Sequence, residues 1–389
     1  MRLSGRIPGG APLNALTRSL DAMRAAGQAV IDLTESNPTH VELRYPSHLL
    51  APLADPRGLR YDPHPLGLAA AREAVAGDAL RRGVSIDPAD VVVTASTSES
   101  YSWLFKLLCD PGDTVLVPAP SYPLFEFLAR AEGVQLATYD LRFDGRWEVD
   151  VASLAAAPPS CRAVVVVSPN NPTGSYIRAG EADAVWALCE ARGWALIADE
   201  VFADYPLDDR NPFTDLAARA PVLTFSLGGA SKSLGLPQIK LGWMTAGGPQ
   251  AERRAALEGL ELVADTFLSV STPVQLAAAD LLHDGTQVRG AIHLRVSHNL
   301  RRARELVGAF PACSLLPVEG GWTAVLRVPG LRAEEALALE LLERERILVH
   351  PGYFFDFPHE AFLVVSLLPP QDTFSDALAR VLRHASATP

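Results

Sequence analysis

Residues 163–199 begin with Ala163-Val164-Val165-Val166-Val167 and end with Ala195-Leu196-Ile197-Ala198-Asp199, and the segment between these runs, 179–192, has the pattern of a helix. Neither apolar run alternates with polar residues, so each is expected to be a strand covered on both faces. A strand, a crossover helix and a second buried strand form a βαβ unit. This stretch therefore predicts an α/β fold with a mostly parallel, doubly wound sheet.

The same alternation of short apolar runs and helical patterns continues on both sides of this unit. Further strand-like runs lie at 91–94, 114–118, 222–226 and 242–246. After about Pro273 the pattern changes to a long charged helix at 289–310, short strands near 324–328 and 362–367, and helices at 333–345 and 372–385. We therefore predict a large domain of residues 45–275 and a smaller α+β domain formed by residues 1–44 and 276–389.

Composition excludes several classes of function. The chain has 389 residues, of which 48% are hydrophobic, and a net charge of -11 without any basic run, which argues against a nucleic-acid partner. Its apolar runs are too short to span a bilayer, and residues 1–10 contain no signal-peptide core, so we expect a soluble cytoplasmic protein without a membrane partner. The four cysteines lack metal-ligand spacing and are expected to be reduced thiols, with no metal site.

Two residues are the candidates for catalysis. Lys232, in Ser231-Lys232-Ser233, would attack an aldehyde only when uncharged, so it requires a buried site that lowers its pKa from about 10.4. In isolation this tripeptide is more typical of a solvated surface lysine. Asp199 ends an apolar strand at the edge where α/β proteins bind ligands, and a carboxylate there would keep a pyridine nitrogen protonated. A strand-end acid that caps the next helix is an equal alternative for Asp199.

Three turns that follow predicted strands contain further candidate ligands. Asn171 lies in a turn between Pro169 and Gly174, and its amide is expected to contact a ring hydroxyl, although turn formation alone also explains this segment. The run Ser96-Thr97-Ser98 would aim backbone N–H groups at a phosphate, whereas a helix N-cap without a ligand is the alternative. Tyr122 would either stack on a planar ring or pack on the core.

The order of these motifs resembles that of the class I/II aminotransferases, which are fold type I pyridoxal-phosphate enzymes. The resemblance covers nearly the whole chain and includes three further elements: Asn37-Pro38, Tyr61 with Gly67, and Pro111-Gly112-Asp113. It implies pyridoxal 5'-phosphate as the cofactor and an enzyme that moves an amino group between an L-amino acid and a 2-oxo acid.

The resemblance also implies a role for each residue. Lys232 would form the Schiff base and act as acid and base, Asp199 would pair with the pyridine nitrogen, and Asn171 would contact the ring hydroxyl. Tyr122 would stack on the ring. The phosphate would be held by Ser96, Thr97, Ser98 and Ser231, and by Tyr61 from the neighbouring subunit of a homodimer.

Three positions depart from the pattern of the family. Lys240 replaces a phosphate-binding arginine and loses its bidentate fork. Phe202 replaces a tyrosine that donates to the ring hydroxyl, unless Tyr205 takes over this role. Val364 stands where an arginine would bind the substrate carboxylate, and no basic residue lies within 361–368.

Two interpretations of the position of Val364 remain open. Either another cation (Arg44, Arg60 or His350) binds the carboxylate, or the substrate presents a different group there. A pyridoxal-phosphate lyase, cyclase or oxidase of a biosynthetic pathway is the alternative function, because the departures fall on the substrate side of the site.

Overall fold

The computed structural model describes residues 4–7, 13–208 and 213–387 and contains an eight-stranded sheet of order β2-β9-β8-β7-β6-β3-β4-β5. The strands are β2 (Val91–Thr94), β3 (Thr114–Ala119), β4 (Gln135–Phe143), β5 (Trp147–Val149), β6 (Cys161–Val167), β7 (Ala195–Asp199), β8 (Thr224–Gly229) and β9 (Gly242–Gly247). The five neighbours from β8 to β4 pair in parallel, whereas β9 is antiparallel to β8 and to β2, and β5 is antiparallel to β4. The predicted mostly parallel sheet is confirmed.

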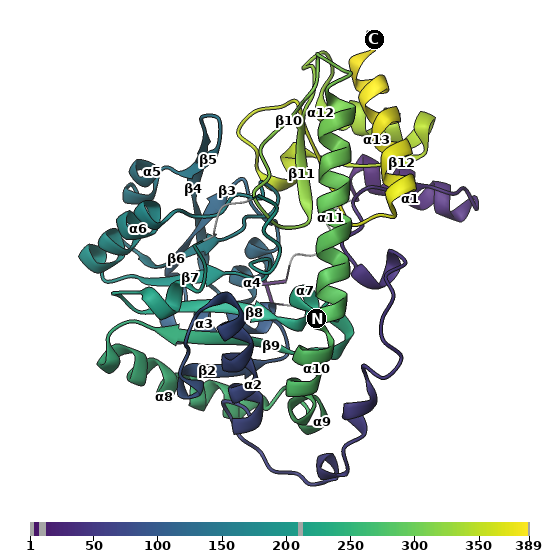
Figure 1. Cartoon of the computed structure of the whole chain (residues 1–389). Coiled ribbons are helices and arrows are strands. Elements are labelled where there is room, and N and C mark those ends of the chain that lie inside the picture. Colours follow the sequence, from purple (N-terminus) through teal and green to yellow (C-terminus); the bar gives the residue numbers. More distant parts are fainter. Residues whose placement is uncertain (1–3, 8–12, 209–212, 388–389) are drawn as a thin grey trace.

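Helices cover both faces of this sheet, which confirms the doubly wound arrangement (Figure 1). On one face, Ala163 and Val165 of β6 lie in the same core cluster as residues of α3 (Thr97–Leu108), α4 (Phe125–Glu132) and α8 (Gln250–Phe267). On the other face, Val164 and Val166 lie in a second cluster with residues of α5 (Val151–Ala155) and α6 (Ala179–Arg192). Successive residues of β6 are buried on opposite faces, which explains why this strand has no polar residue in alternation.

A smaller antiparallel sheet has the order β10-β11-β14-β13. Its strands are β10 (Ser314–Leu315), β11 (Thr323–Arg327), β13 (His350–Pro351) and β14 (Phe362–Ser366). A separate pair joins β1 (Ile31–Asp32) in parallel to β12 (Ile347–Leu348). The helices nearby are α1 (Ala15–Ala25), α12 (Glu334–Glu340), which continues as a π-helical turn over Leu341–Glu345, and α13 (Gln371–Ser386). The predicted smaller α+β unit is therefore present.

One long helix, α11 (Thr286–Val307), connects the two parts of the molecule. Figure 1 shows it in green, running from beside α10 (Ala278–Asp284) near the large sheet to α13 beside the small sheet. The N-terminal segment (purple) places α1 beside α12 and the π-helical turn that follows it, before the chain continues to α2 (Ala69–Ala79). The division of the chain at residues 45 and 275 stays a prediction.

Candidate active site

The carboxyl ends of five strands bring the predicted site residues to one edge of the large sheet. The residues are Ser96, Thr97 and Ser98 after β2, Tyr122 after β3, Asn171 after β6, Asp199 at the end of β7, and Ser231 with Lys232 after β8. β2 contributes to the same edge because two antiparallel pairings, through β9, give it the direction of β8. In α/β folds this edge is where ligands bind.

Asp199 is held by two hydrogen bonds at this edge. The hydroxyl of Tyr101 donates to Oδ2 (2.9 Å), and the backbone N–H of Val201 donates to Oδ1 (3.2 Å). Burial raises the pKa of the Asp199 carboxyl, while both hydrogen bonds and the positive charge of Lys232 oppose this rise. The alternative interpretation of Asp199, a strand-end acid that caps the following backbone, explains the hydrogen bond from Val201. It does not explain the hydrogen bond from Tyr101.

Lys232 has a desolvated amine. It lies in the single turn of α7 (Ala230–Ser233), and its Nζ is 5.0 Å from the ring centroid of Trp322 and 5.5 Å from that of Phe202. Burial lowers the pKa of Lys232 to about 8, against the opposing charges of Asp199 and Glu35. The lowered pKa is the property that a Schiff-base lysine requires.

The other two lysines of the chain lie in different surroundings. Lys106 is exposed and pairs with Glu132 (2.5 Å), and Lys240 is exposed after the short 3-10 helix Pro237–Ile239. The Nζ of Lys106 also lies near a ring, 5.7 Å from the centroid of Phe267. Of the three lysines of the chain, all within the described residues, Lys232 is the one that lies near two aromatic rings and has a pKa lowered by burial.

Two consecutive asparagines differ in how their amides are bound. Asn170 donates to the carbonyl of Pro120 (3.0 Å) and to Thr173 Oγ1 (2.9 Å), and its Oδ1 accepts from Ser121 (3.0 Å). This amide ties two loops of the sheet edge together. The Oδ1 of Asn171, in contrast, is buried and has no hydrogen-bond partner among the described residues.

An orphaned buried amide is unfavourable unless a ligand or water completes it. Asn171 and Asp199 follow neighbouring strands at the edge where the desolvated amine of Lys232 also lies. A planar pyridine would match these three groups, with its hydroxyl at Asn171, its protonated nitrogen at Asp199 and its aldehyde at Lys232. The donor set therefore fits pyridoxal phosphate.

The turn before α3 has the geometry of a capped helix N-terminus. Oγ of Ser96 accepts from the backbone N–H of Glu99 (3.2 Å), and the Glu99 carboxylate accepts from the N–H of Ala95 (2.6 Å). Gly242 packs against this turn so closely that a Cβ there would lie 3.0 Å from the Ser96 backbone. Ser96 therefore caps α3, as the alternative interpretation predicts. The positive end of the helix dipole also makes this first turn suited to bind an anion.

Phe202 and Tyr205 do not restore the missing donor to the ring hydroxyl. The Phe202 ring packs edge-on against Trp322, with centroids 5.2 Å apart. The hydroxyl of Tyr205 donates instead to the carbonyl oxygens of Lys232 (2.7 Å) and Ser233 (3.1 Å). The suggestion that Tyr205 replaces the tyrosine is therefore wrong, because its hydroxyl is committed to the backbone of the lysine turn.

Two aromatic residues of the predicted set are exposed. Tyr122 is 45% exposed, and burial and the charge of Asp199 raise the pKa of its hydroxyl, which indicates that the ring lies near this carboxylate. Tyr61 is 77% exposed. Its surface position is the one expected for a residue that contacts a second subunit.

Val364 is buried in the small sheet. It lies opposite Val325 on β11 and opposite His350 on β13, with 1% of its surface exposed. Burial lowers the pKa of His350, whose ring packs edge-on against Phe354 and Phe355. Of the three replacement cations considered, His350 is the direct cross-strand neighbour of Val364, whereas Arg44 and Arg60 are exposed.

Three residues at the site were not predicted: Tyr101, Trp322 and Glu35. Tyr101 follows the Ser96 turn by about one helical turn, so the helical period could have placed it over the same edge. Trp322 and Glu35 come from distant segments, and no local pattern points from them to Lys232. The pKa influence of Glu35 on Lys232 shows that the N-terminal segment lies near the amine.

Other features of the described residues are consistent with this site. They include no helix that is long and apolar enough to cross a membrane. Nor do they contain a group of three or more His, Cys, Asp or Glu residues suited to a metal ion. All four cysteines are free thiols, as predicted.

Comparison with known proteins identifies the family. Residues 29–380 match the family model of aminotransferase class I and II. Glutamate-pyruvate aminotransferase AlaA of Escherichia coli is 25% identical over 328 residues, which cover 82% of this chain and 81% of that protein. S-alkyl-thiohydroximate lyase SUR1 of Arabidopsis thaliana is 30% identical over 234 residues, which cover 58% of this chain and 50% of that protein.

A solved structure shows the same fold over the full length. The crystal structure of an aminotransferase from Escherichia coli superposes with a TM-score of 0.88, 24% sequence identity, and coverage of 100% of this chain and 99% of that chain. The family match spans both sheets and all the strand ends described above, and the chain belongs to the class I and II aminotransferases.

Proposed function

We propose that this chain is a pyridoxal-phosphate-dependent aminotransferase that transfers an amino group between an L-amino acid and a 2-oxo acid, with Lys232 as the Schiff-base lysine. The observation that supports this assignment best is the desolvated amine of Lys232 beside the buried carboxylate of Asp199. The cofactor, when bound, supplies an electron sink for the carbon that loses a proton. Family membership and the named relative AlaA support the transferase reaction.

Lys232 would perform the proton transfer. With a pKa of about 8 instead of 10.5, its uncharged fraction at neutral pH rises by about 300-fold, because each pKa unit changes the ratio tenfold. An uncharged amine at this position would accept the proton that leaves the donor carbon and, once protonated, would donate it to the carbon of the bound cofactor that receives the amino group. The aromatic rings of Phe202 and Trp322 around Nζ keep water away from this amine.

The other side chains would bind and orient the cofactor. Asp199, fixed by Tyr101, would hold a proton on the pyridine nitrogen, and Asn171 would satisfy its buried amide with the ring hydroxyl. Tyr122 would stack on the ring. The phosphate would lie at the first turn of α3, bound by Ser96, Thr97, Ser98 and Ser231, with the charge of Lys240 nearby.

A homodimer completes the proposal. Tyr61 is exposed on the isolated chain, and in this family its position reaches the phosphate of the adjacent subunit. We therefore propose that each site is made by two copies of the chain and that the protein acts in the cytoplasm on small-molecule amino acids and 2-oxo acids.

The assignment of Lys232 is tested by reductive trapping. Borohydride reduction of the loaded protein is expected to attach the cofactor to Lys232 alone, and mass spectrometry of the peptides can distinguish the three lysines. Lys232→Ala is expected to trap none, while Lys106→Ala, which removes an exposed lysine with no proposed role at the site, is expected to trap a full equivalent. Attachment of the cofactor to Lys106 or Lys240 in the wild-type protein contradicts the proposal.

A lyase is the second candidate, and one comparison supports it. The support is the partial match to a protein named S-alkyl-thiohydroximate lyase. The departures at Phe202 and Val364, which we place on the substrate side of the site, are compatible with a lyase. The two functions separate when L-amino acids and cysteine conjugates are added without a 2-oxo acid. An aminotransferase converts the bound cofactor to its amine form in one turnover, whereas a lyase releases ammonia and a thiol over many turnovers.

A further inference from the structure

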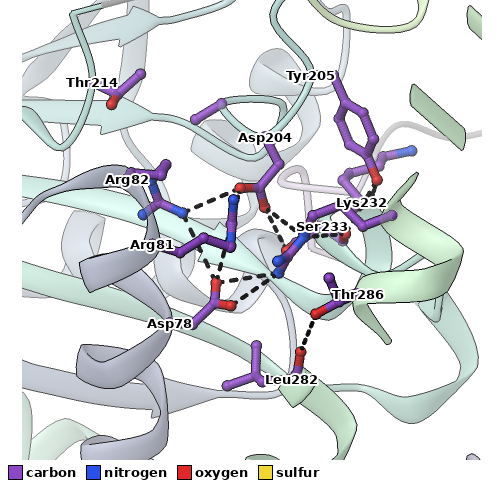
Figure 2. Close-up of polar contacts among 12 residues, drawn as sticks. Asp78, Arg81, Arg82, Asp204, Tyr205, Thr214, Lys232, Ser233, Leu282 and Thr286 are labelled. Carbon is purple, nitrogen blue, oxygen red and sulfur yellow. Dashed lines mark hydrogen bonds and ion pairs between the residues drawn. The ribbon is translucent and has the colours of Figure 1, made fainter. Parts of the chain in front are cut away.

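Polar side chains from other elements bind the turn that contains Lys232, as Figure 2 shows. Because α7 has a single helical turn, its last backbone carbonyls lack partners within the helix. The hydroxyl of Tyr205 donates to the carbonyl oxygens of Lys232 and Ser233, and Nε of Arg289 donates to the carbonyl of Ser233 (3.1 Å). Both carbonyls at the end of the turn are thus bound by side chains from other elements.

Arg289 also binds the side chain of the residue that follows Lys232. Its Nη2 donates to Ser233 Oγ (2.8 Å), and the Ser233 hydroxyl donates to Oδ2 of Asp204 (2.6 Å). The same Nη2 donates to both carboxylate oxygens of Asp78 (3.2 Å each). With 5% of its surface exposed, Arg289 contacts the backbone and the side chain of Ser233 from one planar guanidinium.

The charges around Arg289 are balanced. Three arginines (Arg81, Arg82 and Arg289) face three aspartates (Asp78, Asp204 and Asp215) in a network of ion pairs. Interaction with the arginines lowers the pKa of Asp204 to about 2, so this carboxylate stays charged. Burial and the neighbouring charge of Asp215 raise the pKa of Glu200, which lies beside this network. Since unpaired buried charges are strongly unfavourable, the loss of any one member of this network is expected to destabilise the folded protein.

The position of Arg289 in the fold is informative. It lies in the first turns of α11, the helix that runs to the small sheet, whereas Asp78 belongs to α2 and Asp204 to the loop after β7. In Figure 2 the side chain of Lys232 points away from Asp78 and Asp204, so these charges face the backbone of the turn and not the amine. Apart from burial, the groups that shift the pKa of the amine are Asp199 and Glu35, which are not members of this network.

We propose that Arg289 is a positioning residue for Lys232: its guanidinium, held by Asp78 and Asp204, fixes Ser233 and thereby sets where the lysine amine lies relative to Asp199. This inference rests on the proposed role of Lys232 as the Schiff-base lysine. Nothing in the local sequence of α11 indicates such a role, because Arg289 is 57 residues from Lys232 in the chain.

The test measures the amine itself in the cofactor-free protein. Acetic anhydride reacts with uncharged amines, so trace acetylation at a series of pH values, read by peptide mass spectrometry, gives a titration midpoint for Lys232, with Lys106 and Lys240 as references in the same chain. Arg289→Met is expected to move the Lys232 midpoint by about one pH unit toward its ordinary value, because a displaced turn brings the amine closer to water. The rate of the first half-reaction of the loaded enzyme is expected to fall by about 100-fold, as for a misplacement of about 1 Å.

Arg82→Met is the matched control. It removes the same charge from the same network, since Arg82 pairs with Asp215 (2.6 Å) and Asp204 (3.3 Å), but it makes no contact with Ser233. It is expected to destabilise the protein while leaving the Lys232 midpoint and the half-reaction rate close to those of the wild type. Ser233→Ala, which removes one hydroxyl, is expected to move both readouts in the direction of Arg289→Met, and it supplies the test if Arg289→Met does not fold.

Equal effects of Arg82→Met and Arg289→Met on the midpoint would overturn the inference, because Arg289 would then act through stability alone. Unchanged midpoints in both Arg289→Met and Ser233→Ala would overturn it as well. These results are distinguishable from failure of the proposed function, in which borohydride reduction of the wild-type protein attaches the cofactor to a different lysine.

Discussion

Replacing Lys232 by methionine is expected to stabilise the cofactor-free protein although it abolishes activity. Methionine has a similar length and fits among the rings of Phe202 and Trp322, which contact the end of the lysine side chain. The substitution removes a charge that the folded protein desolvates and the unfolded chain hydrates. The wild-type protein therefore has an energetic disadvantage at this position that the variant lacks.

The magnitude follows from the pKa of the amine. It is about 8 in the folded protein against 10.5 without perturbation, a difference of about 2.5 units. At about 1.4 kcal/mol per unit, the variant is expected to be more stable by about 3 kcal/mol at neutral pH, where Lys232 is protonated in both states. Above the folded pKa the native protein loses this proton while the unfolded chain keeps it. Because the unfolded state then binds more protons, wild-type stability rises with pH, and the gap is expected to narrow to about 2 kcal/mol one unit above the folded pKa.

The measurement is urea unfolding of the two cofactor-free proteins near neutral pH and one unit above the folded pKa, at one fixed protein concentration because a dimer unfolds in a concentration-dependent manner. Lys240→Met is the matched control, since it removes an exposed lysine whose loss is expected to change stability by no more than about 0.5 kcal/mol. If Lys232→Met is no more stable than the wild type, the amine is not desolvated in the folded protein. If the difference in the free energy of unfolding between Lys232→Met and the wild type is the same at both pH values, Lys232 does not titrate between them.

Three further predictions concern neighbouring side chains. Tyr101→Phe removes a hydrogen bond that lowers the pKa of Asp199, so the acid limb of the pH profile of the half-reaction rate is expected to move to higher pH. If this limb does not move, Asp199 does not titrate in catalysis. If His350 binds the substrate carboxylate, His350→Gln is expected to raise KM by about tenfold with little change in kcat. Because burial lowers the pKa of this ring, wild-type KM is expected to begin rising at a lower pH than it would with an ordinary histidine at this position. Val364→Arg buries a guanidinium between Val325 and His350 and is expected to destabilise the protein by about 3 kcal/mol or more without a gain in turnover; higher activity on simple amino acids at unchanged stability would instead place residue 364 at the substrate.

The central strands could be predicted because burial on both faces of the sheet determines nearly all of their sequence. β6 and β7 are buried on both faces, so nearly every residue is apolar and the run has sharp ends. β4 was missed because it lies near the sheet edge and pairs with the short β5, so its residues alternate between buried and exposed positions and include charges. The helix α8 was missed as well, since three of its residues are buried and most of its length faces water.

At the site, the sequence placed the residues that directly follow strands, because parallel strands bring their carboxyl ends to one edge. Lys232, Asp199 and Asn171 are of this kind. Side chains that reach the edge from elsewhere, such as Trp322 and Arg289, could not be placed, since their contacts depend on how the smaller sheet and α11 pack. The same limit explains the error on Tyr205, whose hydroxyl binds the backbone of the lysine turn.

Three groups at this edge are unfavourable in isolation: the desolvated amine of Lys232, the Asp199 carboxyl with its raised pKa, and the amide oxygen of Asn171 without a partner. They come from three neighbouring strands, β8, β7 and β6, and stability alone would favour methionine, asparagine or a smaller residue at each place. One planar ligand with an aldehyde, a protonated ring nitrogen and a hydroxyl would relieve all three at once. A binding site is expected to contain several groups that are unfavourable alone and that one ligand satisfies together. Here that ligand has the chemistry of the cofactor of this family.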